Sequence, residues 1–163
     1  MAGVEQLLFA LSLLAALGCG VVGGVFFAFS TFVMKALVRL PAGEGIAAMN
    51  SINIVVINPW FMTAFLGTGV LCVAALIYSI LKWRDPGAAW LLTGSVLYLA
   101  GSLWVTIAFS VPRNNRLAAV ARSDPDGAKL WEEYVASWTA WNHVRTAALL
   151  TASASFIIAL TAT

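Results

Sequence analysis

Four long apolar segments run along the chain, and polar connections join them. They cover residues 6–34, 59–81, 88–111 and 141–161; the first three contain no charged side chain. A helix needs about 20 apolar residues to cross the hydrocarbon core of a bilayer, which is roughly 30 Å thick. The pattern predicts an all-α membrane protein, a bundle of four transmembrane helices with long first and last helices, in a single domain, 1–163.

Turn and capping residues mark the ends of these predicted helices. Asn58 followed by Pro59 is typical of an N-cap and a first helical position. The polar turn at 82–87 makes a hairpin of the second and third spans. Pro112 is expected to stop the third helix, because proline lacks an N–H and clashes with the preceding turn. Polar side chains interleave with aliphatic ones in 41–58, which we predict to be a short interfacial or re-entrant segment.

The last predicted helix is longer than a membrane requires. It begins near Asp126, and residues 126–140 extend the span in helical form. At 100° per residue, His143 lies about 140° from Trp138. One face of the helix, about 100° wide, carries Trp131, Tyr134, Trp138, Trp141, Asn142 and Arg145. This polar and aromatic stripe and the histidine therefore lie on different faces.

Small residues recur at every fourth position of the first span. They are Ala16, Gly20, Gly24 and Ala28. Such a stripe lets a neighbouring backbone approach closely, as in the small-xxx-small packing of membrane helices. We expect it to serve packing, either within the bundle or against a membrane-protein partner or a second copy of the chain.

The basic residues are distributed unevenly between the two ends of the bundle. Four spans place both termini and the 82–87 turn at one end, which holds two of the nine Lys and Arg residues. The other end holds Lys35, Arg39, Arg113, Arg116, Arg122, Lys129 and Arg145. The positive-inside rule then predicts polar connections in the cytoplasm and termini outside. We expect an integral membrane protein, of a bacterial cell membrane, in contact with membrane lipids.

Composition excludes several other classes of protein. With 61% hydrophobic and 10% charged residues, and a mean hydropathy of +0.92, the chain fits neither a water-soluble domain nor a disordered one. A net charge of +2 without a basic cluster excludes nucleic acid as a partner. Cys19 and Cys72 lie in apolar runs without a C-x-x-C motif, so we expect them to be small buried hydrophobes. With one histidine and no facing carboxylates within the spans, we predict no metal site.

The topology delivers a set of polar and aromatic side chains to one end of the bundle. They are Asn50, Asn53, Asn58, Arg113, Asn114, Trp138, Asn142, His143 and Arg145. Arg145 precedes an apolar run, so its charge needs asparagine side chains, helix-terminal carbonyls or an anionic ligand as partners. Two alternatives stay open: Arg145 snorkels to lipid phosphates, and Trp138 and Trp141 belong to an interfacial aromatic belt. His143 suits proton transfer near neutral pH, but it needs no catalytic role.

Four short motifs occur in order along the chain. They are G-G-V-F-F-A-F-S-T-F-V-M at 23–34, I-N-x-x-V-x-N-P at 52–59, V-P-R-N-x-x-L at 111–117 and W-x-x-W-N-H-V-R-T at 138–146. Together they resemble the anthrone oxygenase-like family of small four-helix membrane proteins. The resemblance implies that fungal relatives oxidise polyketide anthrones to anthraquinones with dioxygen, without a metal or flavin, whereas most bacterial members have no assigned role. The family's polar positions fall on Asn53, Asn58, Pro59, Pro112, Asn114, Trp138, Trp141, Asn142, His143 and Arg145.

These residues suggest a cofactor-independent oxygenase acting on a flat, hydrophobic phenolic or ketonic small molecule. In this hypothesis His143 removes a proton, and Arg145 and Asn142 stabilise the enolate oxygen. Trp138 and Trp141 stack against the polycycle. The remaining substrate contacts are assigned to Asn53, Asn58, Asn114 and Arg113. The alternative is a non-catalytic protein of a larger membrane complex, either an accessory subunit or a protein that binds lipid or a small molecule. A transporter is disfavoured, because the first three spans carry no ionisable residue in mid-membrane.

Overall fold

The computed structural model of the protein describes residues 2–120 and 126–162, and every regular element within them is a helix. Arg122, which contributes to the charge count above, lies outside the described residues. In chain order the α-helices and the π-helical turns (η) are α1 (Ala2–Ala28), η1 (Phe29–Val33), α2 (Met34–Leu37), α3 (Ala42–Val55), α4 (Pro59–Leu81), α5 (Ala88–Tyr98), η2 (Leu99–Trp104), η3 (Thr106–Ser110), α6 (Val111–Ala118) and α7 (Gly127–Thr161).

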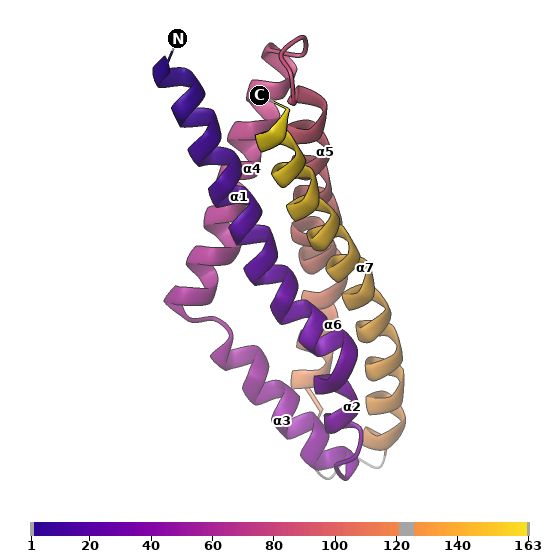
Figure 1. The fold of residues 1–163 in the computed structure, drawn as a ribbon. Coiled ribbons are helices and arrows are strands. Elements are labelled where there is room, and N and C mark those ends of the chain that lie inside the picture. The colour runs from indigo at the N-terminus through magenta and orange to yellow at the C-terminus, as the bar shows by residue number, and fades with distance from the viewer. Residues whose placement is uncertain (1, 121–125, 163) are drawn as a thin grey trace.

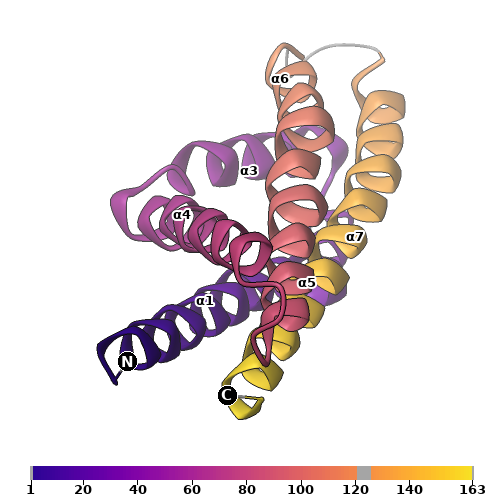
Figure 2. The same cartoon turned by 90° about the horizontal axis from the view of Figure 1, so that it is seen from above.

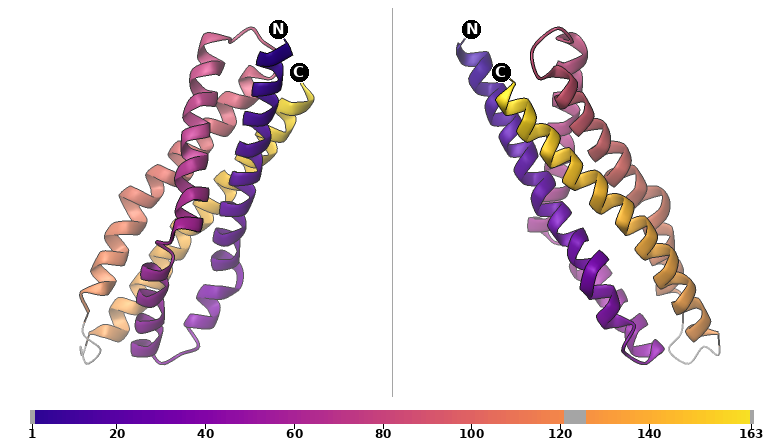
Figure 3. Two further views of the ribbon diagram at one scale, coloured as in Figure 1. Left: turned by 90° about the vertical axis from the view of Figure 1, so that its left-hand side faces the viewer. Right: turned by 45° about the vertical axis from the view of Figure 1, so that its right-hand side comes forward.

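Four helical segments are long and apolar enough to cross a membrane, which confirms the predicted bundle. They are Gly3–Leu37, Pro59–Leu81, Ala88–Ala118 and Gly127–Thr161. The first and the last are the longest, with 35 residues each. Both termini lie at one end of the bundle beside the turn between α4 and α5, whereas α2 and the beginning of α7 lie at the other end (Figures 1 and 3). We call the end that holds α2 and the beginning of α7 the polar end.

The long helices give the bundle two apolar cores in succession. At 1.5 Å per residue, α7 is about 50 Å long, well beyond the roughly 30 Å of hydrocarbon. The span core includes Ala15, Cys19, Phe26, Phe65, Cys72, Tyr98, Leu149 and Phe156. The polar-end core consists of Met34, Leu37, Ile46, Met49, Leu117, Trp131, Tyr134 and Trp138. Cys19 and Cys72 are free and fully buried, as predicted.

The segment between the first two spans is a helix that packs on the polar end. Figure 1 shows α3 running from the polar end along the bundle to the start of α4, and from above it lies across the side of the bundle (Figure 2). Its Ile46 and Met49 enter the polar-end core. Asn58 then caps α4 as predicted: its Oδ1 accepts a hydrogen bond from the backbone N–H of Phe61 at 3.0 Å, and Pro59 occupies the first turn.

The third span corrects the prediction that Pro112 ends the helix. The chain stays helical through the π-helical turns η2 and η3, and Pro112 falls in the first turn of α6. A π-helical turn has a different hydrogen-bond pattern, which accommodates a residue that lacks an N–H. The carbonyl of Phe109, in the preceding turn, accepts a hydrogen bond from the Arg113 guanidinium at 2.7 Å. The helix therefore continues to Ala118, beyond the predicted end at 111.

The small-residue stripe of the first span makes close contact over only part of its length. Ser153 of α7 donates a hydrogen bond to the carbonyl of Ala16 at 2.9 Å, and a Cβ on Gly20 would lie 3.7 Å from the Ser153 Oγ. Gly24, in contrast, faces open space, and Gly23 is the glycine that approaches Leu149 of α7. Close packing within the bundle is thus confirmed for Ala16 and Gly20 but not for Gly24, which faces away from α7; packing against a partner stays a prediction for this position.

Candidate functional site

Arg145 and Asn142 lie where the span core meets the polar-end core. They are one turn apart on α7 and are buried, with 3% and 0% of their surface exposed. The guanidinium of Arg145 donates one hydrogen bond to Asn142 Oδ1 at 2.8 Å and another to Thr106 Oγ1 at 3.2 Å. Its Nε is buried and has no hydrogen-bond partner. The helix face predicted from the 100° periodicity thus points Arg145 into the bundle.

Asn142 fixes this arrangement by bridging α7 to the first span. Its Nδ2 donates to the carbonyl of Phe26 and to the hydroxyl of Ser30, both at 2.7 Å. Ser30 lies in the π-helical turn η1, and turns of this kind occur frequently at functional sites. Because the Asn142 amide group donates to the first span, its oxygen is oriented toward Arg145.

Two aromatic rings lie beside the Arg145 guanidinium. Its Cζ lies 4.1 Å from the ring centroid of Phe26 and 5.1 Å from that of Trp138. The ring of Phe29 packs against Trp138 at a centroid distance of 5.6 Å. Cation–π contacts of this kind stabilise a desolvated cation, but they do not neutralise its charge. We call Phe26, Thr106, Trp138, Asn142 and Arg145 the Arg145 site.

The charge of Arg145 has no acidic partner among the residues that the structure describes. Between described residues, the one ion pair within 4.0 Å joins Arg116 to Glu133 at the surface. A buried charge without a counterion is costly, because its hydration is lost and only hydrogen bonds and ring contacts offset that loss. Among the described residues, hydrogen bonds to neutral groups and contacts with aromatic rings are the interactions that offset the burial of this charge.

Further unpaired polar atoms surround the site. Trp138 Nε1 and Asn53 Nδ2 are buried donors without a hydrogen-bond partner. The hydroxyl of Tyr134 donates to Asn114 Oδ1 at 2.9 Å, and the side chains of Asn53 and Arg145 lie near it. An unpaired buried donor destabilises a protein by about 1–3 kcal/mol, so these groups add to the cost of burying Arg145.

The structure brings some of the predicted site residues together and keeps others apart. Trp138, Asn142 and Arg145 are in contact, and Asn53 and Asn114 join them through Tyr134. The separate ones are Trp141, Asn58, Arg113 and His143. Trp141 stacks on Phe109 with ring centroids 3.7 Å apart, and Asn58 uses its side chain for capping and for a hydrogen bond to the carbonyl of Val55.

His143 lies on the outer face of α7, with an exposed side chain. This confirms that the histidine and the aromatic stripe occupy different faces. The role of a base beside Arg145 requires the imidazole to reach the buried site, and the structure does not place it there. Phe26, Ser30 and Thr106 were not predicted as site residues; Phe26 and Ser30 lie in the 23–34 motif, whereas Thr106 is one of several hydroxyl residues in the third span.

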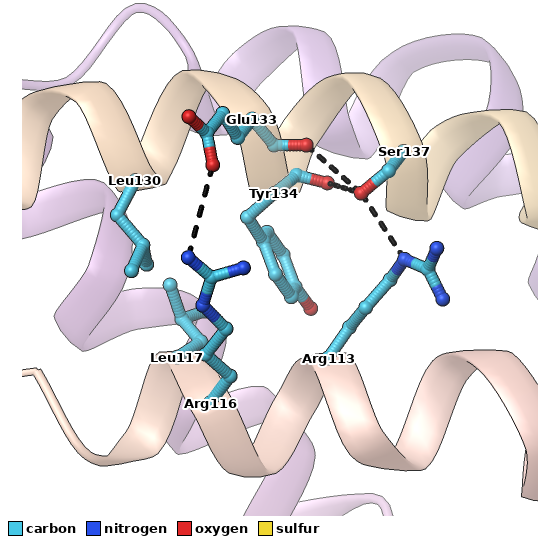
Figure 4. Close-up of a pocket in the computed structure, with 7 residues that line it drawn as sticks. All are labelled: Arg113, Arg116, Leu117, Leu130, Glu133, Tyr134 and Ser137. Carbon is cyan, nitrogen blue, oxygen red and sulfur yellow. Dashed lines mark hydrogen bonds and ion pairs between the residues drawn. The ribbon is translucent and has the colours of Figure 1, made fainter.

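Arg113 lies in a separate pocket of about 240 Å³ between α6 and α7 (Figure 4). Tyr134 contributes to the wall of this pocket and also belongs to the polar network near Arg145. A larger pocket, of about 630 Å³, lies at the opposite end of the bundle near Glu5 and Asp85. Within residues 2–120 and 126–162, no three His, Cys, Asp or Glu side chains gather in a way that could hold a metal ion.

Comparison with known proteins identifies a protein family. A protein-family model described as anthrone oxygenase matches residues 60–155, more than half of the chain. The matched range begins at α4 and includes Thr106, Trp138, Asn142 and Arg145, whereas Phe26 and Ser30 lie before it. No curated protein and no solved structure matches the chain.

Proposed function

The chain belongs to the anthrone oxygenase family, and we propose that it is a membrane-embedded oxygenase whose Arg145 site binds the carbonyl oxygen of a flat, hydrophobic phenolic or ketonic compound such as an anthrone. One observation carries the proposal. Arg145 is buried among neutral partners and retains an unpaired Nε–H. Such a group is suited to an oxygen atom that gains negative charge during a reaction.

The proposed reaction begins with loss of a proton from the methylene carbon opposite the carbonyl group of the anthrone. The electron pair of the broken C–H bond moves into the ring system, and the carbonyl oxygen becomes an enolate oxygen. The Arg145 guanidinium binds this oxygen, and the attraction is stronger in a buried site than in water because the local dielectric is lower. The proton leaves to solvent.

Dioxygen then reacts at the electron-rich carbon. The enolate supplies the electrons, a C–O bond forms, and the resulting peroxide takes up a proton. Loss of water from the hydroperoxide, with cleavage of the O–O bond and of the remaining C–H bond, leaves a second carbonyl group. One dioxygen is consumed and one water is released for each anthrone converted to anthraquinone. The chain's contribution is to bind, orient and lower the energy of the enolate.

The aromatic rings beside Arg145 support a flat aromatic substrate. Phe26 and Trp138 face the guanidinium, and a polycycle can stack on such rings. The unpaired Nε–H of Trp138 offers a second donor to a substrate oxygen. A hydrophobic substrate partitions into the bilayer and reaches the bundle from the lipid.

Dioxygen uptake by the purified protein with an anthrone tests the proposal. We expect uptake above the spontaneous rate, and a fall of about 10²–10³-fold in Arg145→Gln, the loss typical of removing an oxyanion donor. Arg145→Lys keeps the positive charge but loses the planar guanidinium group, so we expect a rate between those of the wild type and Arg145→Gln. Arg84→Gln, at an exposed position of the opposite end, is the matched control. Wild-type uptake by a folded Arg145→Gln protein would rule the proposal out.

A further inference from the structure

The pocket between α6 and α7 is a second basic site, distinct from the Arg145 site. Arg113 and Arg116 enter it from α6, one turn apart, and Glu133, Tyr134 and Ser137 enter it from α7. Leu117 and Leu130 complete its lining. Figure 4 shows the two arginines on either side of the Tyr134 ring, with the pocket between the helices. Two guanidinium groups and one carboxylate give the lining a net positive charge.

Arg113 is held in place by neutral groups alone. Its Nε donates to Ser137 Oγ at 3.1 Å, and its NH1 donates to the carbonyl of Phe109 at 2.7 Å. Ser137 is itself fixed, since its hydroxyl donates to the carbonyl of Glu133 at 2.8 Å. The guanidinium is therefore preorganised, and among the described residues no acidic side chain pairs with it.

Arg116 has a weak partner that an incoming anion can replace. Its NH2 lies 3.9 Å from a carboxylate oxygen of Glu133, and the two side chains are 71% and 55% exposed. Exposed pairs of this kind contribute about 0–1 kcal/mol, because water and salt screen them. The Glu133 carboxylate is thus a weakly bound partner of Arg116, and the two arginines leave the pocket with a net positive charge.

We propose that this pocket binds a phosphate-bearing anion, presented by an anionic phospholipid at the polar-end boundary of the membrane. Guanidinium groups bind phosphate oxygens through paired N–H donors, and basic pockets between membrane helices bind lipid headgroups. The volume of about 240 Å³ is below the roughly 300–1,000 Å³ of pockets for drug-sized ligands, so it suits a headgroup. One turn towards the membrane lies the Phe109–Trp141 stack, which offers an apolar surface for an acyl chain.

Native mass spectrometry of the purified protein, titrated separately with phosphatidylglycerol and with phosphatidylcholine, tests this proposal. We expect preferential retention of phosphatidylglycerol, weakened about tenfold in Arg113→Gln and in Arg116→Gln, since each removes a charge-assisted contact. Glu133→Gln removes the competing carboxylate, so its retention of phosphatidylglycerol should rise. Arg84→Gln should behave as wild type. Arg116 and Glu133 are mostly exposed, so these two variants should fold even if Arg113→Gln does not.

A competition arm with free glycerol phosphate distinguishes the two sources of the phosphate group. If free glycerol phosphate displaces the lipid at equal concentration, the phosphate site stands and its ligand comes from solution. If it displaces the lipid only in large excess, the lipid is the ligand. Equal retention of phosphatidylglycerol and phosphatidylcholine, or retention of phosphatidylglycerol that Arg116→Gln and Glu133→Gln leave unchanged, would overturn the proposal.

Discussion

At the residue scale, the site depends on how Arg145 is buried. Periodicity alone predicts that Trp138, Asn142 and Arg145 share a helix face, and the structure confirms it. Periodicity does not predict Phe26 and Thr106 as partners, because the register between two membrane helices is set by their mutual packing. The same limit applies to His143, whose residue type suggested catalysis although its position on α7 takes it out of the bundle.

His143→Ala should therefore leave anthrone-dependent dioxygen uptake unchanged. Its side chain is exposed and lies on the opposite face from Arg145. The comparison is Trp138→Phe, which keeps a ring at the site and removes the unpaired N–H donor. A hydrogen bond to a charged oxygen contributes about 1.5–3 kcal/mol, so this variant should lose at least about tenfold in kcat/KM. A large loss in His143→Ala would restore the histidine as the base.

Asn58 is expected to contribute to stability rather than to substrate binding. Its Oδ1 caps α4, and its Nδ2 donates to the carbonyl of Val55 at 3.0 Å. Asn58→Ala should lower the unfolding free energy by about 1 kcal/mol, whereas Asn58→Ser, which retains a capping oxygen, should lose less. Thermal unfolding in detergent measures both. A raised KM in Asn58→Ser with unchanged stability would instead assign the residue to the substrate.

At the element scale, local signals decided which helix boundaries could be predicted. The cap at Asn58 and the long apolar runs depend on neighbouring residues, and the predicted boundaries of α4 agree with the structure. The continuation through Pro112 depends on the π-helical turn η3, which packs against α7, so no local pattern reveals it. The small-residue stripe has the same limit, because only tertiary contacts show that Gly23, and not Gly24, approaches α7.

The close approach of η2 to α7 gives a test of this packing. A Cβ on Gly101 would lie 2.5 Å from the Cβ of Ala148, a methyl group that cannot move without its helix. Gly101→Ala should therefore lower the unfolding free energy by about 1–3 kcal/mol, as overpacking does. Gly24→Ala meets open space, so it should be neutral or raise stability by up to about 1 kcal/mol through helix propensity. Thermal unfolding midpoints that rank the two variants in the opposite order would contradict the packing.

At the scale of the whole molecule, the two cores divide the protein into a membrane part and a polar-end part. The arrangement of four spans with both termini at one end was predictable, because each span reverses the direction of the chain. The size of the polar end was less predictable, since α3 joins it through tertiary contacts with α2, α6 and α7. The Arg145 site lies at the junction of the two parts, where the proposed substrate would pass from lipid to polar groups.

We propose that the polar end faces the cytoplasm, and cysteine labelling tests this orientation. Arg84→Cys and Asn115→Cys place a thiol at an exposed position at each end of the bundle. The native Cys19 and Cys72 are fully buried, so they give little background. A membrane-impermeant thiol reagent should label the first variant in intact cells and the second only after permeabilisation. The reverse pattern would invert the orientation without changing the site.

The most direct test of the central claim is the absorption spectrum of an anthrone bound to the purified protein without dioxygen. In the absence of the oxidant the proposed enolate cannot react further, so it should accumulate at the Arg145 site. We predict that the wild-type protein shifts the bound anthrone towards its enolate spectrum at a pH where the free compound stays a ketone, and that folded Arg145→Gln does not. An enolate spectrum of equal strength in both proteins, or in neither, would contradict the role assigned to Arg145.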